Sequence, residues 1–409
     1  MTILSGAQLV LPDRILAPGT LAIDGDRITD VREGSWSGRD ARRSPVFAFH
    51  GHTIVPGFID VHVHGLEGID TLDGHDDSGR TAVAAMASRL PRYGVTAFCP
   101  TTVACAPDAL RRVLESVAAA RRPGRDLGAA RVLPAHLESN FINPDFRGAQ
   151  PAGCLRSPRQ ALSPIHQPSD GFQAAELLAE IVRAGADVGI VTVAPELDGG
   201  LDLVRWLIAR GYRVSLGHSG ATFEQALEAI AAGARQATHL FNRMPPLAHR
   251  APGLAGAVLS SDEIAAEIIC DGYHVHPALV RTAVTSKHPS RVMAITDGTA
   301  LSGLAVGSRG SLGGQPIVAG ESAALLADGT LAGSVCTMDR VFRMLVGPTR
   351  LPLVAAAALC ATTAAREMGL EDLGVIAPGA IADLVVLDDR LSVVQTYVGG
   401  HLAYRRNEP

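Results

Sequence analysis

The stretch Val55–Gly65, VPGFIDVHVHG, is an apolar run that ends in two histidines, His62 and His64. Successive side chains of a β-strand point to opposite faces, so histidines two positions apart share a face. A buried strand gives paired imidazoles few polar partners, whereas zinc and iron accept imidazole nitrogen readily. The stretch therefore predicts a buried strand with metal ligands at its end. Two hydrogen-bonded histidines on a half-exposed strand are the alternative.

Short apolar runs and helical stretches alternate along the chain after this point. Helices are expected over 81–94, 107–122, 174–186 and 201–211. Strands are expected over 53–64, 95–102, 131–139, 188–196, 213–220, 236–242, 263–274 and 291–298. Eight strands that alternate with helices predict an α/β fold, a parallel (β/α)8 barrel of the TIM type.

The two ends of the chain have a different pattern. Residues 1–52 and 366–409 contain short strands of alternating apolar and polar residues, which predict one small β-sandwich domain built from both termini. The barrel then occupies residues 53–365. Within it, the Gly-rich stretch at about 303–330 predicts a hairpin insertion.

Composition excludes several classes of protein. The chain has 409 residues, 47% of them hydrophobic and 19% charged, with a net charge of -5, which favours a folded protein and no nucleic-acid partner. The N-terminus lacks a signal-peptide pattern, and no apolar run reaches the length of a membrane span. The six cysteines form no CxxC pair and indicate reduced thiols. We therefore expect a cytoplasmic protein without membrane contact.

Polar residues collect where the predicted strands end. These residues are His62, His64, His136, Glu138, His218, His239, His274 and Asp297. The carboxyl ends of the strands carry the active site in (β/α)8 enzymes. The sequence therefore predicts an active site at this end of the barrel.

Metal chemistry explains most of these residues. Glu138, His218 and His239 are the ligand types of a catalytic metal that leaves one position for water. His62 and His64 can form a second site if Glu138 bridges two cations. A divalent ion lowers the pKa of bound water to about 7. Asp297 is then the proton acceptor, with a helix N-cap as its alternative role.

Several motifs together point to one family. PGFIDVHVHG, HLES, GHSGAT, THLFNRMPP, CDGYHVHP, ITDGTA and LAGS occur in this order. As a set, and with the tail that follows them, they closely resemble the N-acetylglucosamine-6-phosphate deacetylases of the amidohydrolase superfamily. The resemblance implies metal-dependent hydrolysis of the acetamide of N-acetylglucosamine 6-phosphate, which yields glucosamine 6-phosphate and acetate in amino-sugar catabolism.

The resemblance also implies residue roles. Metal ligands would be Glu138, His218 and His239, with His62 and His64 at a second site that only some members keep, and Asp297 would be catalytic. Arg250 and His274 would hold the sugar phosphate, with the arginine reaching across a homodimer interface. The residues that match positions along the sugar are Ala149, Gln150, Asn242, Leu331, Ala332 and Gly333.

The expected cofactor is one or two divalent ions. Zinc fits the donor set best, and iron, manganese or cobalt remain open. Lys287 is the only lysine, and it lies away from every predicted strand end. A carbamylated lysine, which bridges the metals of dihydroorotases and ureases, is therefore excluded, and Glu138 must serve as the bridge.

Some residues depart from the family pattern. Ser139 and Asn140 replace a Gly-Pro pair, Gln150 replaces a common histidine, and Arg243 replaces an alanine beside the expected sugar site. Arg243 either enters the substrate pocket or points to solvent. These departures leave open a deacetylase of N-acetylgalactosamine 6-phosphate or of another N-acyl amino sugar. A catalytically silent sugar-phosphate-binding protein is disfavoured, because every metal-ligand match and Asp297 are retained.

Overall fold

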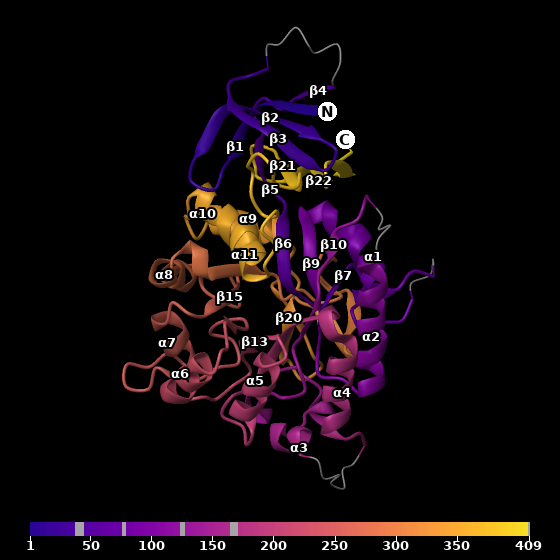
Figure 1. Ribbon diagram of the computed structural model, residues 1–409, viewed down its shortest axis with the longest axis vertical. Coiled ribbons are helices and arrows are strands. Elements are labelled where there is room, and N and C mark those ends of the chain that lie inside the picture. The colour runs from indigo at the N-terminus through magenta and orange to yellow at the C-terminus, as the bar shows by residue number, and fades with distance from the viewer. Residues whose placement is uncertain (37–44, 76–78, 123–126, 164–170, 408–409) are drawn as a thin grey trace.

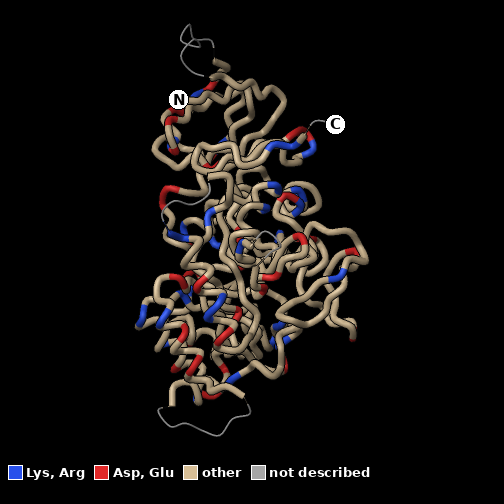
Figure 2. Tube along the Cα trace, turned by 90° about the vertical axis from the view of Figure 1, so that its right-hand side faces the viewer, with Lys and Arg blue, Asp and Glu red and all other residues tan. Residues whose placement is uncertain are grey.

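The computed structural model describes residues 1–36, 45–75, 79–122, 127–163 and 171–407. A β-rich part that contains both termini lies at one end of the molecule, and a larger α/β part fills the rest (Figure 1). Acidic and basic residues are interspersed over both parts (Figure 2). In the described residues, every helix is too short or too polar to cross a membrane.

The larger part is a parallel barrel, which confirms the predicted fold class. Its strands, in spatial order, are β6 (Phe58–Val63), β9 (Val95–Thr102) with β10 (Arg131–Val132) beside it, β11 (Ala135–Leu137), β12 (Val188–Val193), β13 (Arg213–Leu216), β14 (Gln236–Ala237), β15 (Ala265–Ile269) and β16 (Val292–Ile295). The ring closes where Asp297 N donates to His62 O at 3.0 Å and His64 N donates to Gly298 O at 2.8 Å. The ends of the first and last strands therefore lie side by side.

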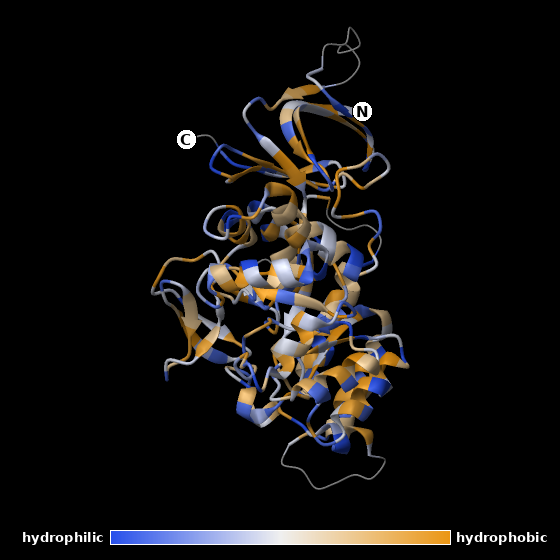
Figure 3. Ribbon diagram, turned by 90° about the vertical axis from the view of Figure 1, so that its left-hand side faces the viewer, coloured by the Kyte–Doolittle hydropathy of each residue, from blue (hydrophilic) through white to orange (hydrophobic). Residues whose placement is uncertain are grey.

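The helices of the barrel cover its outside. They are α1 (Ala82–Arg89), α2 (Pro107–Ala120), α3 (Pro158–Leu162), α4 (Ala174–Ala184), α5 (Gly200–Ile208), α6 (Phe223–Ala231), α7 (Gly253–Ser260) and α8 (Pro277–Lys287). Buried apolar residues of these helices pack in one core with residues of the strands, and hydrophobic and hydrophilic stretches alternate along the ribbon (Figure 3). In α6, Thr222 and Gln225 form a capping box that satisfies the first backbone N–H groups.

The strand expected over 53–64 is two strands with different partners. Thr53–Pro56 forms β5, which pairs with β1 (Thr2–Val10) and β21 (Leu384–Leu387), whereas β6 joins the barrel. The break falls at Gly57, where a Cβ would overlap the side chain of Thr96 on β9. The close approach of two strands therefore requires glycine at this position.

Both ends of the chain contribute to one sheet. Its order is β23 (His401–Arg405), β22 (Val393–Val398), β21, β5, β1, β2 (Ile15–Asp24) and β3 (Arg27–Glu33), with β4 (Val46–Ala48) beside β1. A separate core, which includes Leu4, Leu21, Ile54 and Leu384, lies against it. Helices α9 (Met338–Val346), α10 (Leu353–Ala357) and α11 (Thr363–Glu367) lie between this sheet and the barrel, since α10 contacts β1 and α11 contacts β6.

The expected hairpin insertion is a four-stranded antiparallel sheet. Its strands are β17 (Arg309–Leu312), β18 (Gln315–Ala319), β19 (Ala323–Leu325) and β20 (Leu331–Ser334). The last strand returns to the barrel, where Ser334 pairs with Gly298. This pairing brings the LAGS motif next to Asp297, and Ser334 N donates to Asp297 O at 2.9 Å.

Candidate active site

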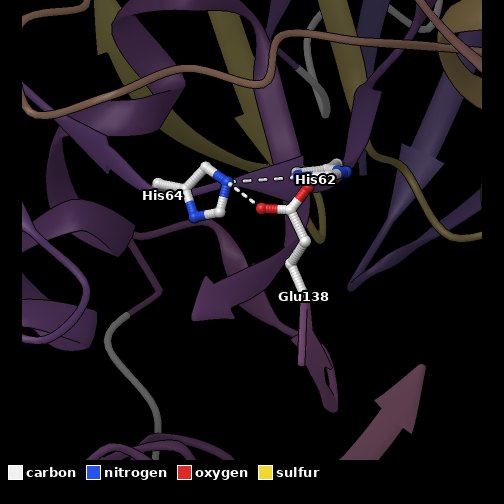
Figure 4. Close-up of side chains that lie close together, drawn as sticks. All are labelled: His62, His64 and Glu138. Atoms are coloured by element: carbon white, nitrogen blue, oxygen red, sulfur yellow. Dashed lines mark hydrogen bonds and ion pairs between the residues drawn. The ribbon is translucent and has the colours of Figure 1, made fainter. Parts of the chain in front are cut away.

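The predicted polar residues converge at the carboxyl ends of the strands. His62 lies in β6, His64 directly follows it, Glu138 follows β11, and these three side chains point toward one another (Figure 4). His218 follows β13, His239 follows β14, and Asp297 follows β16. All six side chains are buried.

Three of these residues have strained backbones. The φ angles of His218, His239 and Asp297 are 46°, 30° and 48°, in the left-handed region that side-chain-bearing residues rarely adopt. Such conformations cost about 1–3 kcal/mol each and persist where the surrounding structure enforces them. The turns after β13, β14 and β16 therefore hold these side chains over the barrel at a cost in stability, as is common at functional sites.

Glu138, His218 and His239 form the first donor group. The Nε2 atoms of both histidines lie 2.8 Å from the same oxygen, Oε1, of Glu138, and 3.0 Å from each other. The Nδ1 of His218 donates to Phe146 O at 2.8 Å, which directs Nε2 toward Glu138. Hydrogen bonds join both Nε2 atoms to the carboxylate, and a divalent cation could replace their protons because imidazole nitrogen and carboxylate oxygen are both metal ligands. The group therefore fits a divalent metal ion.

His62 and His64 form a second donor group on the other side of Glu138. Their Nε2 atoms are 3.2 Å apart, and His64 Nε2 lies 3.3 Å from Glu138 Oε2. Asp297 Oδ1 lies 3.2 Å from His64 Nε2 and 3.5 Å from His62 Nε2. His62 Nε2 lies 3.6 Å from Glu138 Oε1, so the carboxylate lies between the two histidine pairs, where it can bridge two ions.

The charges in this cluster balance one another. Burial acts to raise the pKa of Glu138, but the charge and hydrogen bonds of the surrounding histidines hold that pKa well below its usual range. Burial also opposes ionisation of Asp297, yet the hydrogen bond and charge of His64 lower its pKa. Burial disfavours imidazolium, but the neighbouring carboxylates raise the pKa of His62 to about 9 and that of His64 to about 10. Asp297 is therefore an ionised carboxylate at neutral pH and can accept a proton.

A pocket of about 460 Å³ lies in front of the donor groups. Every predicted substrate-binding residue except Arg250 lines it: Ala149, Gln150, Asn242, Arg243, His274, Leu331, Ala332 and Gly333. Arg250 instead lies on an exposed loop of this chain. Within one protomer, Arg250 therefore does not line the pocket that His274 lines.

His274 presents one free nitrogen near this pocket. Its Nδ1 is 2.6 Å from Asp271 Oδ2, and its buried Nε2 has no hydrogen-bond partner among the described residues. Burial lowers the pKa of this imidazole, but the hydrogen bond and charge of Asp271 outweigh burial and raise it. A cationic His274 could therefore donate from Nε2 to an anion.

The four residues that depart from the family pattern divide into two that lie outside the pocket and two that line it. Ser139 Oγ donates to Thr192 O on β12 at 2.5 Å, and Asn140 Nδ2 donates to two backbone carbonyls at 2.7 and 2.8 Å. Both residues bind backbone groups and do not line the pocket. Gln150 lies in the pocket but donates from Nε2 to Glu138 Oε2 and accepts from Ala104 N at 2.7 Å. Arg243 also enters the pocket, with Nη2 3.5 Å from Leu331 O.

His136 lies beside the second donor group, with its ring centroid 4.6 Å from that of His62, whereas Lys287 lies away from both groups. His136 has both ring nitrogens satisfied, with Nδ1 3.0 Å from Val61 O and Nε2 2.9 Å from Thr192 Oγ1, and burial lowers its pKa to about 4. Lys287 ends α8, just before β16 begins, and donates to Ser261 O. It therefore lies at the opposite end of the barrel from the donor groups.

Glu267 is a residue of the site that the polar residues at the strand ends do not predict. This carboxylate is fully buried in β15 and lies 2.8 Å from His62 Nδ1. Its signal was available as a lone acidic residue inside the apolar run AAEIIC. An ionisable residue in the middle of a buried strand needs a partner, and here that partner is a candidate metal ligand.

Comparisons with known proteins agree with this geometry. The amidohydrolase family profile matches residues 53–403. The human N-acetylglucosamine-6-phosphate deacetylase is 37% identical over 98% of this chain and 94% of its own length. The Bacillus subtilis (strain 168) protein of the same name is 32% identical over 98% and 96%.

Solved structures extend the likeness to the fold. A mutant N-acetyl-D-glucosamine-6-phosphate deacetylase from Mycobacterium smegmatis, in complex with N-acetyl-D-glucosamine-6-phosphate, superposes with a TM-score of 0.85 at 31% identity, over 98% of this chain and 99% of the other. The chain belongs to the amidohydrolase family and, within it, to the N-acetylglucosamine-6-phosphate deacetylases.

Proposed function

We propose that this enzyme hydrolyses the acetamide of N-acetylglucosamine 6-phosphate to glucosamine 6-phosphate and acetate. The observation that carries the proposal is a single carboxylate, Glu138, between two histidine pairs, with the ionised Asp297 beside it and a 460 Å³ pocket in front. The substrate in the complex of the Mycobacterium smegmatis relative supports the choice of sugar.

Each site residue has a role in this reaction. Glu138, His218 and His239 would hold one divalent ion, and His62 and His64 would hold a second ion with Glu138. A bound ion supplies Lewis-acid activation of water and of the acetamide carbonyl. Asp297 takes a proton from the attacking water as the C–O bond forms, and it gives that proton to the nitrogen as the C–N bond breaks. One water is consumed, and acetate and the free amine leave.

We infer that the ion is zinc. One carboxylate with several imidazoles and an open position is the usual donor set of catalytic zinc, and no thiolate contributes in the described part of the chain. Iron, manganese and cobalt accept the same donors, so metal supply also decides which ion is bound.

The substrate's phosphate needs cations at the far end of the pocket. We place it against His274 and Arg243 of the same chain, and against Arg250 from a second copy of the chain in a homodimer. The free Nε2 of His274 and the exposed position of Arg250 support this arrangement. Ala149, Asn242 and residues 331–333 would contact the sugar. The cytoplasmic location stays a prediction.

Acetate release from N-acetylglucosamine 6-phosphate tests the proposal. The purified enzyme should release acetate, lose this activity after chelation, and regain it when zinc is added back. Turnover that persists after complete removal of metal would contradict the proposed chemistry. Metal-loaded protein that releases no acetate would contradict the proposed substrate.

A further inference from the structure

Strand β15 carries a buried carboxylate, Glu267, between two apolar residues. Ala265 and Ile269, which share the inward face of the strand with Glu267, belong to the apolar core inside the barrel. The Glu267 side chain has no exposed surface, and it does not line the pocket. A buried carboxylate is costly unless its partners stabilise the charge, so its contacts indicate its purpose.

Those contacts lead to the candidate metal ligands. Glu267 Oε2 lies 2.8 Å from His62 Nδ1 and 3.4 Å from the backbone N of His239. Glu267 Oε1 accepts from Gln236 Nε2 and lies 3.7 Å from His136 Nδ1, which itself hydrogen-bonds a backbone carbonyl. Gln236 therefore anchors one oxygen, while the other oxygen meets His62.

The four candidate ligand histidines differ at Nδ1. His62 faces a carboxylate, His218 faces the carbonyl of Phe146, and the buried Nδ1 atoms of His64 and His239 have no partner among the described residues. A carboxylate that accepts the Nδ1 proton fixes the tautomer, so that the Nε2 lone pair points away toward a metal, and it makes the imidazole a stronger donor. Of these four rings, only that of His62 contacts a carboxylate through Nδ1.

We propose that Glu267 is a positioning residue that enables the chain to hold a second divalent ion between His62, His64 and Glu138. Glu267 orients His62 and increases its donor strength without touching the ion or the substrate. The first donor group has no comparable dependence, because Glu267 reaches it only through the long contact to the backbone N of His239. This inference rests on the proposed metal-dependent function, but ion binding can be measured without any substrate.

Zinc binding by the full-length protein tests the inference. Metal-free wild-type protein is dialysed against buffered free Zn²⁺ over a range of concentrations, and bound zinc per chain is measured by atomic emission. We expect two ions per wild-type chain. In Glu267→Gln, which keeps the shape and loses the charge, we expect the second ion to bind about 10–100-fold more weakly while the first is retained.

Two further variants separate a metal effect from a folding effect. Glu180→Gln removes a carboxylate that is 7% exposed and pairs with Arg111 and Arg183 on the outer helices, and it should still bind two ions. Glu267→Asp keeps the charge with a shorter reach, and it should recover part of the second-ion affinity. Thermal unfolding of each metal-free protein shows whether it is folded.

Several results would overturn the inference. Wild-type protein that binds a single ion at saturating zinc would mean that no second site exists for Glu267 to support. Equal second-ion affinity in wild type and Glu267→Gln would show that the carboxylate does not act on His62, as would equal losses in Glu267→Gln and Glu180→Gln. Failure of the proposed function would appear separately, as two-ion protein that releases no acetate.

Discussion

Glu138 is the residue on which both candidate metal sites depend, because its carboxylate lies between the two pairs of histidines. Gln150 donates to one of its oxygens and so fixes the carboxylate in the bridging orientation. The amide of Gln150 therefore has a contact inside the donor cluster as well as a place in the pocket.

Asp297 gives the first prediction. Asn in place of Asp297 tolerates the left-handed backbone and keeps the side-chain shape, but it cannot accept a proton from water. We expect kcat for acetate release to fall about 10²–10⁴-fold with unchanged zinc content. Steady-state kinetics and metal analysis check this. Unchanged kcat would show that Asp297 has only a structural role.

Arg243 gives a second prediction, since it lines the pocket within its own chain. A charge-assisted hydrogen bond to phosphate contributes about 1.5–3 kcal/mol. In Arg243→Ala we therefore expect KM for the phosphorylated sugar to rise about 10-fold or more. Unphosphorylated N-acetylglucosamine serves as the control substrate, and its KM should not change. An equal change for both sugars would place Arg243 away from the phosphate.

At the scale of elements, α11 ends in a charged clamp. Glu367 lies 2.6 Å from Arg213 on β13 and 3.1 Å from Arg291, which precedes β16. Burial acts to raise the pKa of Glu367, but the charge of Arg213 and the other guanidinium contacts lower it below its usual value. The clamp therefore stabilises the fold above the ordinary glutamate pKa, and this stabilisation is lost as the pH falls through the lower pKa of the folded state.

Substitution of Glu367 tests this clamp. Glu367→Gln should lower the free energy of unfolding by about 1–3 kcal/mol at pH 7. The difference from wild type should shrink as the pH drops below about 4.5. Urea unfolding at pH 7 and pH 3.5 measures both values, with Glu371→Gln, at an exposed position, as the control. A difference that stays constant with pH would contradict the assigned cause.

The arrangement of strands and helices shows which features the sequence could predict. Apolar runs identify all eight barrel strands because these strands are buried, and polar residues after them mark the carboxyl end. The break at Gly57 was not predictable, since Thr96 on another strand causes it. The four-stranded insertion and the contact of Glu267 with His62 likewise depend on segments far apart in the sequence. The roles of the site residues stay predictions until variants are measured.

At the scale of the whole molecule, the terminal sheet ties the two ends of the chain together. Strand β5 pairs with β1 on one side and with β21 on the other, directly before β6 delivers His62 and His64. The sheet thus fixes the start of the strand that carries the second donor group. Truncation at either end removes a neighbour of β5.

The proposed homodimer makes a prediction about Arg250, which lies outside the pocket of its own chain. Arg250→Ala and Asp297→Asn should each be nearly inactive at low substrate concentration. After mixing and subunit exchange, half of the dimers would be mixed, and each would contain one intact site, so about a quarter of wild-type activity should return. A protein that is monomeric by light scattering, or mixtures that recover no activity, would contradict an arginine shared across an interface.

The most direct test of the central claim compares kcat/KM for acetate release from four substrates by the zinc-loaded enzyme. These are the 6-phosphates of N-acetylglucosamine and N-acetylgalactosamine and the two unphosphorylated sugars. We predict that N-acetylglucosamine 6-phosphate is the best substrate and that its unphosphorylated form is far poorer. A preference for the galactosamine phosphate, or equal turnover with and without phosphate, would contradict the assigned substrate.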